Sequence, residues 1–451
     1  MTSAPHAAAA GAHPAPAAAA ASPASTLITD IGELWTLDPA LDDAPERQVL
    51  RDAALVLEGG RVAWYGPADD APAADERVDA AGRAVLPGWV DSHSHLIFDG
   101  DRSAEFEARM AGRAYAAGGI QVTTDATRAA LDASGGDRLE QLVRARIAEA
   151  VAGGTTCLET KTGYGLTLED EARSAALAAR LVADGTLDEA TYLGAHLVPR
   201  EFDGAHGRPG AGAYVDLAAG PMLEAVREQA GDRLRWADVF CEDGAFDVAQ
   251  SRRVLRAARA AGLGLRVHGH QLARSGGVAL AVELGAASVD HLNHMSAEDV
   301  DALAATAALP VREASGGLLA VDAGPTVATV LPACDLSTRA ALAPARALLD
   351  AGAVVALASN CNPGTSYTSS MSFCVATAVL QMRLSLAEAI RAATRGGALA
   401  LRRADVGHLA VGARADVHLL AAPAAIHLAY RPGMPMTAAV WRRGQRLHPA
   451  A

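Results

Sequence analysis

The stretch PGWVDSHSHL, residues 87–96, is an apolar run that ends in two histidines. Side chains alternate between the two faces of a β-strand, so His93 and His95 share a face if the strand extends this far. Two imidazoles on one face are able to bind a single metal ion. The stretch therefore predicts a strand whose C-terminal end supplies two metal ligands. A pair of exposed loop histidines is the alternative.

Apolar runs and helical segments alternate along the middle of the chain. The segments between the runs are rich in Ala, Leu and Arg and have helical periodicity, as in 138–152, 168–181 and 250–261. Eight strands that are each followed by a helix are typical of an α/β protein with a (β/α)8 barrel. The predicted strands are 88–96, 155–161, 191–197, 236–241, 264–268, 287–291, 326–331 and 353–359.

The C-terminal ends of the predicted strands carry polar and ionisable residues. Active sites of (β/α)8 barrels form at this end, where the loops after the strands meet. We therefore expect these residues to form one site. They are His93, His95, Lys161, Tyr164, His196, Glu242, Asp243, His268, His291 and Asn360.

The two ends of the chain have a different pattern, in which short β-like runs are broken by turns. We expect residues 25–86 and 405–451 to form one small β-sandwich domain beside a barrel domain of residues 87–404. Residues 1–24 are almost wholly Ala, Pro, Ser, Gly and His, which predicts a disordered tail. Residues 310–325 look like an inserted loop.

Composition limits the class of partner. A formal net charge of −13 argues against binding to nucleic acid or to an anionic membrane. No apolar stretch approaches the length of about 18 residues that spans a bilayer. The five cysteines form no C-x-x-C pair, which suits free thiols in a reducing compartment. We expect a soluble cytoplasmic enzyme with a small-molecule substrate, and a homodimer is the default for this size.

Three of the histidines suggest hydrolytic chemistry. The imidazoles of His93, His95 and His268 would supply the ligands of a catalytic divalent metal and leave positions open for water. Such a metal lowers the pKa of water from 15.7 to about 7, which favours hydrolysis of a carbon–nitrogen or carbon–oxygen bond. His196 and His291 would then orient the substrate or move protons.

Cationic and phenolic side chains follow the first two strands. Arg102 together with Tyr115 and Tyr164 suits a substrate with a carboxylate, because a guanidinium binds carboxylates bidentately. For Arg102, an ion pair with a neighbouring aspartate is the alternative. Lys161 is the only lysine among 39 basic residues. A compact amine that can lose its proton when buried is one reason to retain it, and chance is the other.

Several motifs resemble those of the amidohydrolase superfamily, namely HSHL at 93–96, KTGYGL at 161–166, HGHQ at 268–271 and CNPGT at 361–365. Within it, the resemblance is to enzymes of histidine degradation that open the ring of 4-imidazolone-5-propanoate to give N-formimidoyl-L-glutamate. It implies one zinc or iron ion, held by His93, His95, His268 and Asn360. The catalytic residues that it implies are Gln271, His291 and Asn360. The implied substrate-binding residues are Arg102, Tyr115, Tyr164, His196, Gln271, Asn362, Gly364 and Thr365.

One residue departs from the superfamily pattern. Asn360 stands where the eighth strand of these enzymes supplies an aspartate, and an amide cannot act as a carboxylate base. Gln271 offers no replacement carboxylate. Three hypotheses therefore stay open. They are an active enzyme of this type, a related hydrolase or deaminase acting on another cyclic amide or formimino compound, and a catalytically silent metal-binding homologue.

Overall fold

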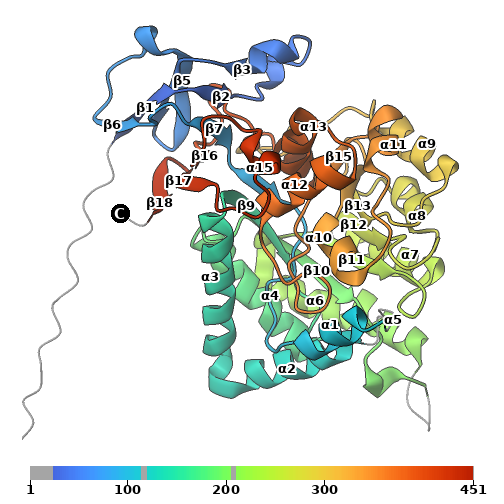
Figure 1. Cartoon of the computed structure of the whole chain (residues 1–451). Coiled ribbons are helices and arrows are strands. Elements are labelled where there is room, and N and C mark those ends of the chain that lie inside the picture. Colours follow the sequence, from blue (N-terminus) through green and yellow to red (C-terminus); the bar gives the residue numbers. More distant parts are fainter. Residues whose placement is uncertain (1–23, 113–118, 205–209, 450–451) are drawn as a thin grey trace, which may run out of the picture.

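A parallel sheet of eight strands forms the centre of the computed structural model, which describes residues 24–112, 119–204 and 210–449 (Figure 1). The strands follow one another in chain order, from β8 at one edge to β15 at the other. They are β8 (Trp89–Asp91), β9 (Thr155–Lys161), β10 (Glu189–Ala195), β11 (Leu234–Cys241), β12 (Gly264–Gly269), β13 (Ser288–His291), β14 (Val327–Val330) and β15 (Val355–Leu357). Helices follow the strands, so the predicted (β/α)8 architecture is confirmed.

The two edge strands of this sheet are joined just beyond their C-terminal ends. The backbone N–H of Asn360 donates to the carbonyl of His93 at 2.9 Å, and the N–H of His95 donates to the carbonyl of Cys361 at 2.9 Å. On the outside of the same seam lie η8 (Ala392–Gly396), which is a π-helical turn, and α14 (Gly397–Ala400). The barrel is therefore closed by the segments that carry the predicted metal ligands.

The strand predicted over 88–96 is shorter in the structure and ends at Asp91. His93 and His95 lie in the segment that follows it. The backbone of this segment bonds to single partners on both sides rather than to a strand ladder. The N–H of Ser94 donates to the Glu159 side chain at 3.1 Å, and the N–H of Leu96 donates to Thr160 Oγ1 at 2.8 Å. Beyond Asp91, single bonds to side-chain acceptors and to backbone groups thus replace the regular ladder.

Helices surround the barrel, and side-chain caps fix where several of them begin. Thr167 accepts from the Asp170 N–H at the start of α4 (Leu168–Ala183), and Asp247 forms a capping box with Gln250 at α7 (Val248–Ala260). These caps satisfy N–H groups that lack a partner in the first turn. The other barrel helices of the described chain are α1 (Ser103–Met110), α2 (Ile120–Asp132), α3 (Asp137–Ala152), α5 (Ala211–Ala219), α6 (Pro221–Ala230), α8 (Gly277–Glu283), α9 (Ala297–Thr306), α10 (Pro332–Thr338), α11 (Ala345–Asp350), α12 (Met371–Gln381) and α13 (Leu386–Arg391). Within the described ranges, none of the helices combines the length and apolar character that crossing a membrane requires.

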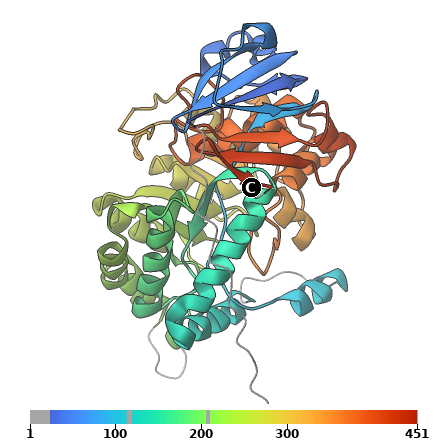
Figure 2. The ribbon, with the colours of Figure 1, turned by 90° about the vertical axis from the view of Figure 1, so that its left-hand side faces the viewer.

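Two further sheets pack on each other beside the barrel (Figure 2). One contains β1 (Ser25–Ile31), β4 (Ala53–Glu58), β5 (Arg61–Pro67) and β6 (Glu76–Asp79). The other joins both ends of the chain through β2 (Glu33–Trp35), β3 (Val49–Leu50), β7 (Ala84–Pro87), β16 (Val417–Leu420), β17 (Thr437–Arg442) and β18 (Gln445–His448). A shared apolar core that includes Leu55, Val417 and Trp441 lies between the sheets. The domain limits at residues 86 and 405 stay a prediction.

A buried carboxylate ties this sandwich to the barrel. Asp188, which directly precedes β10, accepts from Arg414 at 2.5 Å and from Arg442 at 2.6 Å. Burial alone would raise the pKa of the Asp188 carboxyl, but the two guanidinium groups outweigh it and hold the pKa well below its usual value. The predicted insertion 310–325 is also anchored, because the Leu319 N–H donates to the Arg402 carbonyl at 2.8 Å.

At the seam of the barrel, the first residue of α14, Gly397, has no room for a side chain. A Cβ at Gly397 would overlap the carbonyl oxygen of Val90, whereas a Cβ at Gly212 in α5 would meet open space. We expect Gly397→Ala to lower the free energy of unfolding by about 1 to 3 kcal/mol through overpacking. Gly212→Ala is the matched control, and it should leave stability equal or raise it by up to about 1 kcal/mol. Urea denaturation of both variants checks this, and equal stability of the two would contradict the packing at the seam.

Candidate active site

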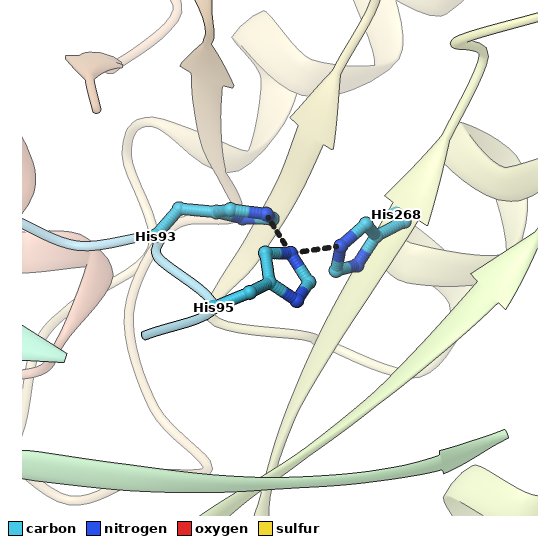
Figure 3. A group of neighbouring side chains, drawn as sticks. All are labelled: His93, His95 and His268. Carbon is cyan, nitrogen blue, oxygen red and sulfur yellow. Dashed lines mark hydrogen bonds between the residues drawn. The ribbon is translucent and has the colours of Figure 1, made fainter. Parts of the chain in front are cut away.

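Three histidine side chains meet inside the C-terminal end of the barrel (Figure 3). His93 and His95 come from the segment after β8, His268 comes from β12, and all three are buried. The Nε2 atom of His95 lies 3.3 Å from Nε2 of His93 and 3.3 Å from Nε2 of His268. The structure thus brings together the three residues that the sequence nominates as metal ligands.

Two carboxylates determine which ring nitrogen of these histidines carries a proton. Nδ1 of His93 lies 2.7 Å from Asp290 Oδ2, and Nδ1 of His268 lies 3.0 Å from Asp238 Oδ1. A carboxylate accepts, so each Nδ1 donates and each Nε2 of the neutral ring presents a lone pair. Burial lowers the pKa of His93 and of His95 well below the usual value, which keeps both rings neutral.

The lone pairs of these rings lack enough donors. Nε2 of His95 carries at most one proton, so it cannot satisfy both His93 and His268. A cation bound to all three nitrogen atoms would satisfy every lone pair. The donor set therefore fits a metal ion that prefers imidazole ligands, such as zinc or iron.

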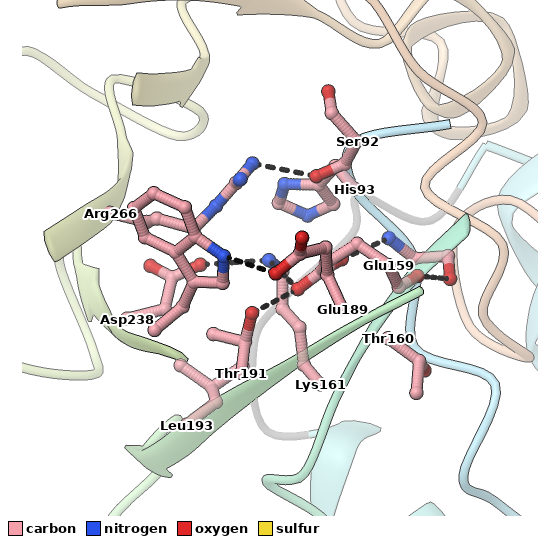
Figure 4. Close-up of polar contacts among 12 residues, drawn as sticks. Ser92, His93, Glu159, Thr160, Lys161, Glu189, Thr191, Leu193, Asp238 and Arg266 are labelled. Carbon is pink, nitrogen blue, oxygen red and sulfur yellow. Dashed lines mark hydrogen bonds and ion pairs between the residues drawn. The ribbon is translucent and has the colours of Figure 1, made fainter. Parts of the chain in front are cut away.

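Lys161 lies at the centre of a buried network beneath the histidines (Figure 4). Its Nζ is 2.9 Å from Glu159 Oε1 and 3.1 Å from Asp238 Oδ2. Glu159 holds the backbone of Ser94, between His93 and His95, while Asp238 holds His268. The single lysine thus connects the two halves of the histidine cluster, which accounts for an amine at this position.

The network has more negative than positive groups. Arg266 lies 3.3 Å from Asp290 Oδ2 and donates to the Ser92 carbonyl at 2.7 Å. The carboxylates of Glu159, Asp238 and Asp290 therefore face two cations, Lys161 and Arg266. When all are ionised, one negative charge is in surplus, and a bound metal cation would offset it.

His196 presents a lone pair to the same cavity. Its Nδ1 lies 2.8 Å from the carbonyl of Gly163, which accepts, so Nε2 is left as an acceptor. Burial lowers the pKa of His196 to about 3, so the ring is neutral. Its ring stacks on that of His95 with centroids 5.4 Å apart, and the Tyr164 ring lies 5.2 Å from it.

Arg102 is buried and pairs with a carboxylate that differs from the alternative suggested by the sequence. Its Nε and Nη2 both donate to Glu105, at 2.8 and 2.6 Å, whereas Asp99 binds Arg138. A Cβ on Gly364 would overlap the guanidinium of Arg102, so only glycine leaves space for it here. The spacing of three residues between Arg102 and Glu105, one turn of α1, is the signal that could have identified this pair.

The loop after β15 is shaped by the amide of Asn362. Its Oδ1 accepts from the N–H groups of Gly364 and Thr365, at 2.9 and 2.8 Å, and its Nδ2 donates to the Asn360 carbonyl at 2.6 Å. Asn362 and Thr365 line the cavity beside the histidines, and Gly364 lies against Arg102.

Strained backbone and unpaired polar atoms gather at this site. His270, His291, Leu292 and Asn360 have positive φ values of 60°, 87°, 68° and 51°. Such values are rare outside glycine and often mark functional sites. Among the described residues, nothing forms a hydrogen bond with His291 Nδ1 or with either polar atom of the Asn360 side chain, although all are buried. These atoms are available to a ligand.

The cavity that these residues form is narrow, with about 20 Å³ of free space, so it holds roughly one water molecule. Binding of a larger substrate therefore requires lining side chains to move. Tyr115 lies outside the described residues. The lining residues are His95, Arg102, Ile120, Tyr164, His196, Phe240, His268, Gln271, His291, Asn360, Asn362 and Thr365.

Sequence reasoning missed the carboxylates that support the histidines. Asp238 interrupts the apolar strand β11, and Asp290 directly precedes His291 in β13. A charged residue inside a fully buried strand needs a partner. The need of a buried charge for a partner could therefore have identified Asp238 and Asp290 from the sequence.

Comparison with known proteins agrees with this geometry. The model of the amidohydrolase family matches residues 84–446. The imidazolonepropionase of Micrococcus luteus is 65% identical over 423 residues, 94% of this chain and 99% of the relative. The imidazolonepropionase of Paenarthrobacter aurescens is 62% identical over 435 residues, covering 94% and 98% of the two chains.

The chain belongs to the imidazolonepropionases of the amidohydrolase family. The same fold also occurs in proteins of much lower sequence identity. A variant of atrazine chlorohydrolase from Arthrobacter aurescens, solved with zinc and atraton, has a TM-score of 0.64 with 19% identity over 93% of this chain and 94% of its own. Zinc is thus bound by one structural neighbour of this amidohydrolase.

The lysine network gives a stability prediction. Lys161→Met would leave the carboxylates of Glu159 and Asp238 buried without their cation, so we expect the free energy of unfolding to fall by about 3 to 5 kcal/mol. Arg312→Met, which breaks an ion pair with Asp322 that is 64% and 63% exposed, is the control and should change little. Urea denaturation measures both. Wild-type stability of the Lys161 variant would refute the role of the network.

Proposed function

We propose that this chain hydrolyses the cyclic carbon–nitrogen bond of 4-imidazolone-5-propanoate and releases N-formimidoyl-L-glutamate. The observation that carries the proposal is one buried cavity lined by both convergent imidazoles and the guanidinium of Arg102. The imidazoles suit a hydrolytic metal, and the guanidinium suits the propanoate carboxylate. The printed names of relatives that are 65% and 62% identical support the same reaction.

The metal would be one zinc or iron ion held by His93, His95 and His268, with Asn360 Oδ1 as a weak fourth ligand. When bound, such an ion polarises a carbonyl oxygen and lowers the pKa of water. The side-chain oxygen of Asn360 is buried without a hydrogen-bond partner in the described structure, which leaves it available for this purpose.

Binding of the substrate would use both ends of the cavity. Arg102 would take the propanoate carboxylate, in exchange for part of its bidentate contact with Glu105. The lone pair on His196 Nε2 would accept from a ring N–H, and Tyr164 beside it would cover the ring. Because the cavity is narrow, these contacts replace water and fix the ring against His291.

His291 would carry the proton that the reaction moves. Its neutral imidazole takes a proton from water as the water oxygen bonds to the ring carbonyl carbon. It then gives that proton to the ring nitrogen as the carbon–nitrogen bond breaks. Burial lowers the pKa of His291 well below its usual value, so the ring is neutral at the start. Gln271, which also lines the cavity, would donate to the carbonyl oxygen as negative charge develops.

A second candidate is a catalytically silent metal-binding homologue, which Asn360 favours because it removes the carboxylate base. A third is hydrolysis or deamination of a related cyclic amide or formimino compound. Decay of the ultraviolet absorbance of the imidazolone on mixing with metal-loaded protein tests the proposal. No decay at full metal loading would refute it, and a panel of related substrates would then separate the remaining two. The cytoplasmic location and the homodimer stay predictions from the sequence.

Two substitutions should separate metal binding from substrate binding. We expect His268→Ala to reduce the metal content from about one ion per chain to almost none, because it removes a ligand. Arg102→Ala should retain the metal and raise KM by about tenfold to a hundredfold, since a hydrogen bond to a charged group contributes about 1.5 to 3 kcal/mol. Elemental analysis and steady-state kinetics measure the two effects. Equal metal content in both variants would contradict the assignment.

A substitution at residue 360 tests whether an amide suffices there. Aspartate tolerates the left-handed backbone of this position as asparagine does. If His291 moves the proton, the wild-type protein is active and Asn360→Asp changes kcat by less than about tenfold. Turnover that appears only in the Asn360→Asp protein would instead identify the natural chain as silent.

A further inference from the structure

A second cavity lies next to the catalytic one and has no role in the chemistry above. It has a volume of about 380 Å³, and Gln271 lines both cavities. A volume of this size is typical of sites for small molecules. Gln271 Nε2 also lies 3.9 Å from Cys334 Sγ on the border between the two spaces.

Two buried acceptors without donors line this second cavity. The Asp335 side chain is 1% exposed, and its Oδ2 accepts from the Ala343 N–H at 3.2 Å, but Oδ1 has no partner in the described chain. Asn293 is 9% exposed and donates to the Ala341 carbonyl at 2.8 Å, but its Oδ1 also lacks a donor there. Buried acceptors without donors are costly, so a ligand that brings N–H groups would be favoured.

Cationic side chains line the same cavity. Arg339 follows α10, is exposed and forms no ion pair with any described residue. Arg109 is buried and places its guanidinium between the Glu105 carboxylate and the Gly364 carbonyl, at 3.2 and 2.6 Å. Burial raises the pKa of Asp335 to about 7, although hydrogen bonding by the Asn293 side chain and the Ala343 N–H lowers it. The cavity therefore suits a ligand that has both a nitrogen cation and a carboxylate.

We propose that this cavity binds the ring-opened product, an N-formimidoyl amino dicarboxylate, before release. Its amidinium N–H groups donate to Asp335 and Asn293, and one carboxylate pairs with Arg339. The inference rests on the proposed function, because ring opening is what creates the amidinium and the second carboxylate. The cyclic substrate has one carboxylate but no amidinium, so the acceptors of Asp335 and Asn293 distinguish product from substrate.

Product inhibition of the metal-loaded full-length enzyme tests this site. Asp335→Asn keeps an oxygen for the Ala343 N–H and removes the charge, so we expect the inhibition constant of N-formimidoyl-L-glutamate to rise about tenfold or more. The kcat/KM for the imidazolone should change less than about threefold. N-acetyl-L-glutamate, which has a neutral amide, should inhibit both proteins equally.

Arg339→Ala provides a second variant whose side chain is exposed, so its folding is not in question. It should raise the inhibition constants of both N-formimidoyl-L-glutamate and N-acetyl-L-glutamate. Arg383→Ala is the matched control, because Arg383 is also exposed and has a φ of 62° beside the 57° of Arg339. Equal inhibition constants in wild-type, Asp335→Asn and Arg339→Ala proteins that turn over normally would overturn the site.

The same variants separate this inference from the proposed function. If the wild-type protein fails to hydrolyse the imidazolone, the proposed function is wrong. Calorimetric titration with N-formimidoyl-L-glutamate then still tests the cavity without turnover. Binding that is weaker in Asp335→Asn supports the site, and equal or undetectable binding overturns it.

Discussion

The hydrogen bonds from His93 to Asp290 and from His268 to Asp238 are the contacts on which the site depends. Each places the proton on Nδ1 and aims the Nε2 lone pair at the third imidazole, that of His95. Without them, either ring could turn its N–H inward and satisfy its neighbour with no metal. The carboxylates thus direct the lone pairs to where a cation would bind, and the ion pairs with Lys161 and Arg266 offset the cost of burying the carboxylates.

Closure of the barrel and construction of the site use the same few residues. The backbone bonds that join the segments after β8 and β15 belong to His93, His95, Asn360 and Cys361. A change that opens the seam therefore also moves ligands apart. The left-handed backbone of Asn360 lies at this closure, where its N–H donates to the His93 carbonyl.

The sequence indicated the barrel well because strand periodicity and strand-end polarity are local signals. β9 lies at the residues predicted, Thr155–Lys161, since all seven are buried and flanked by turns. The histidine pair was misplaced on a strand, because the bonds that end β8 come from Glu159 and Thr160, far along the chain. The sequence also contains no local signal for which charged side chains pair in the site. Asp238 and Asp290 needed three-dimensional contact to be linked to their histidines. Glu105 competed for Arg102 with Asp99, which is equally far away in sequence, and with Asp101, which is nearer.

The coordination of a bound ion tests the central claim most directly. X-ray absorption spectroscopy of the zinc-loaded protein should show three imidazole nitrogens at about 2.0 to 2.1 Å, the usual distance for zinc and histidine. One or two imidazoles, or a shell made only of oxygen, would contradict the convergence of His93, His95 and His268 on one ion.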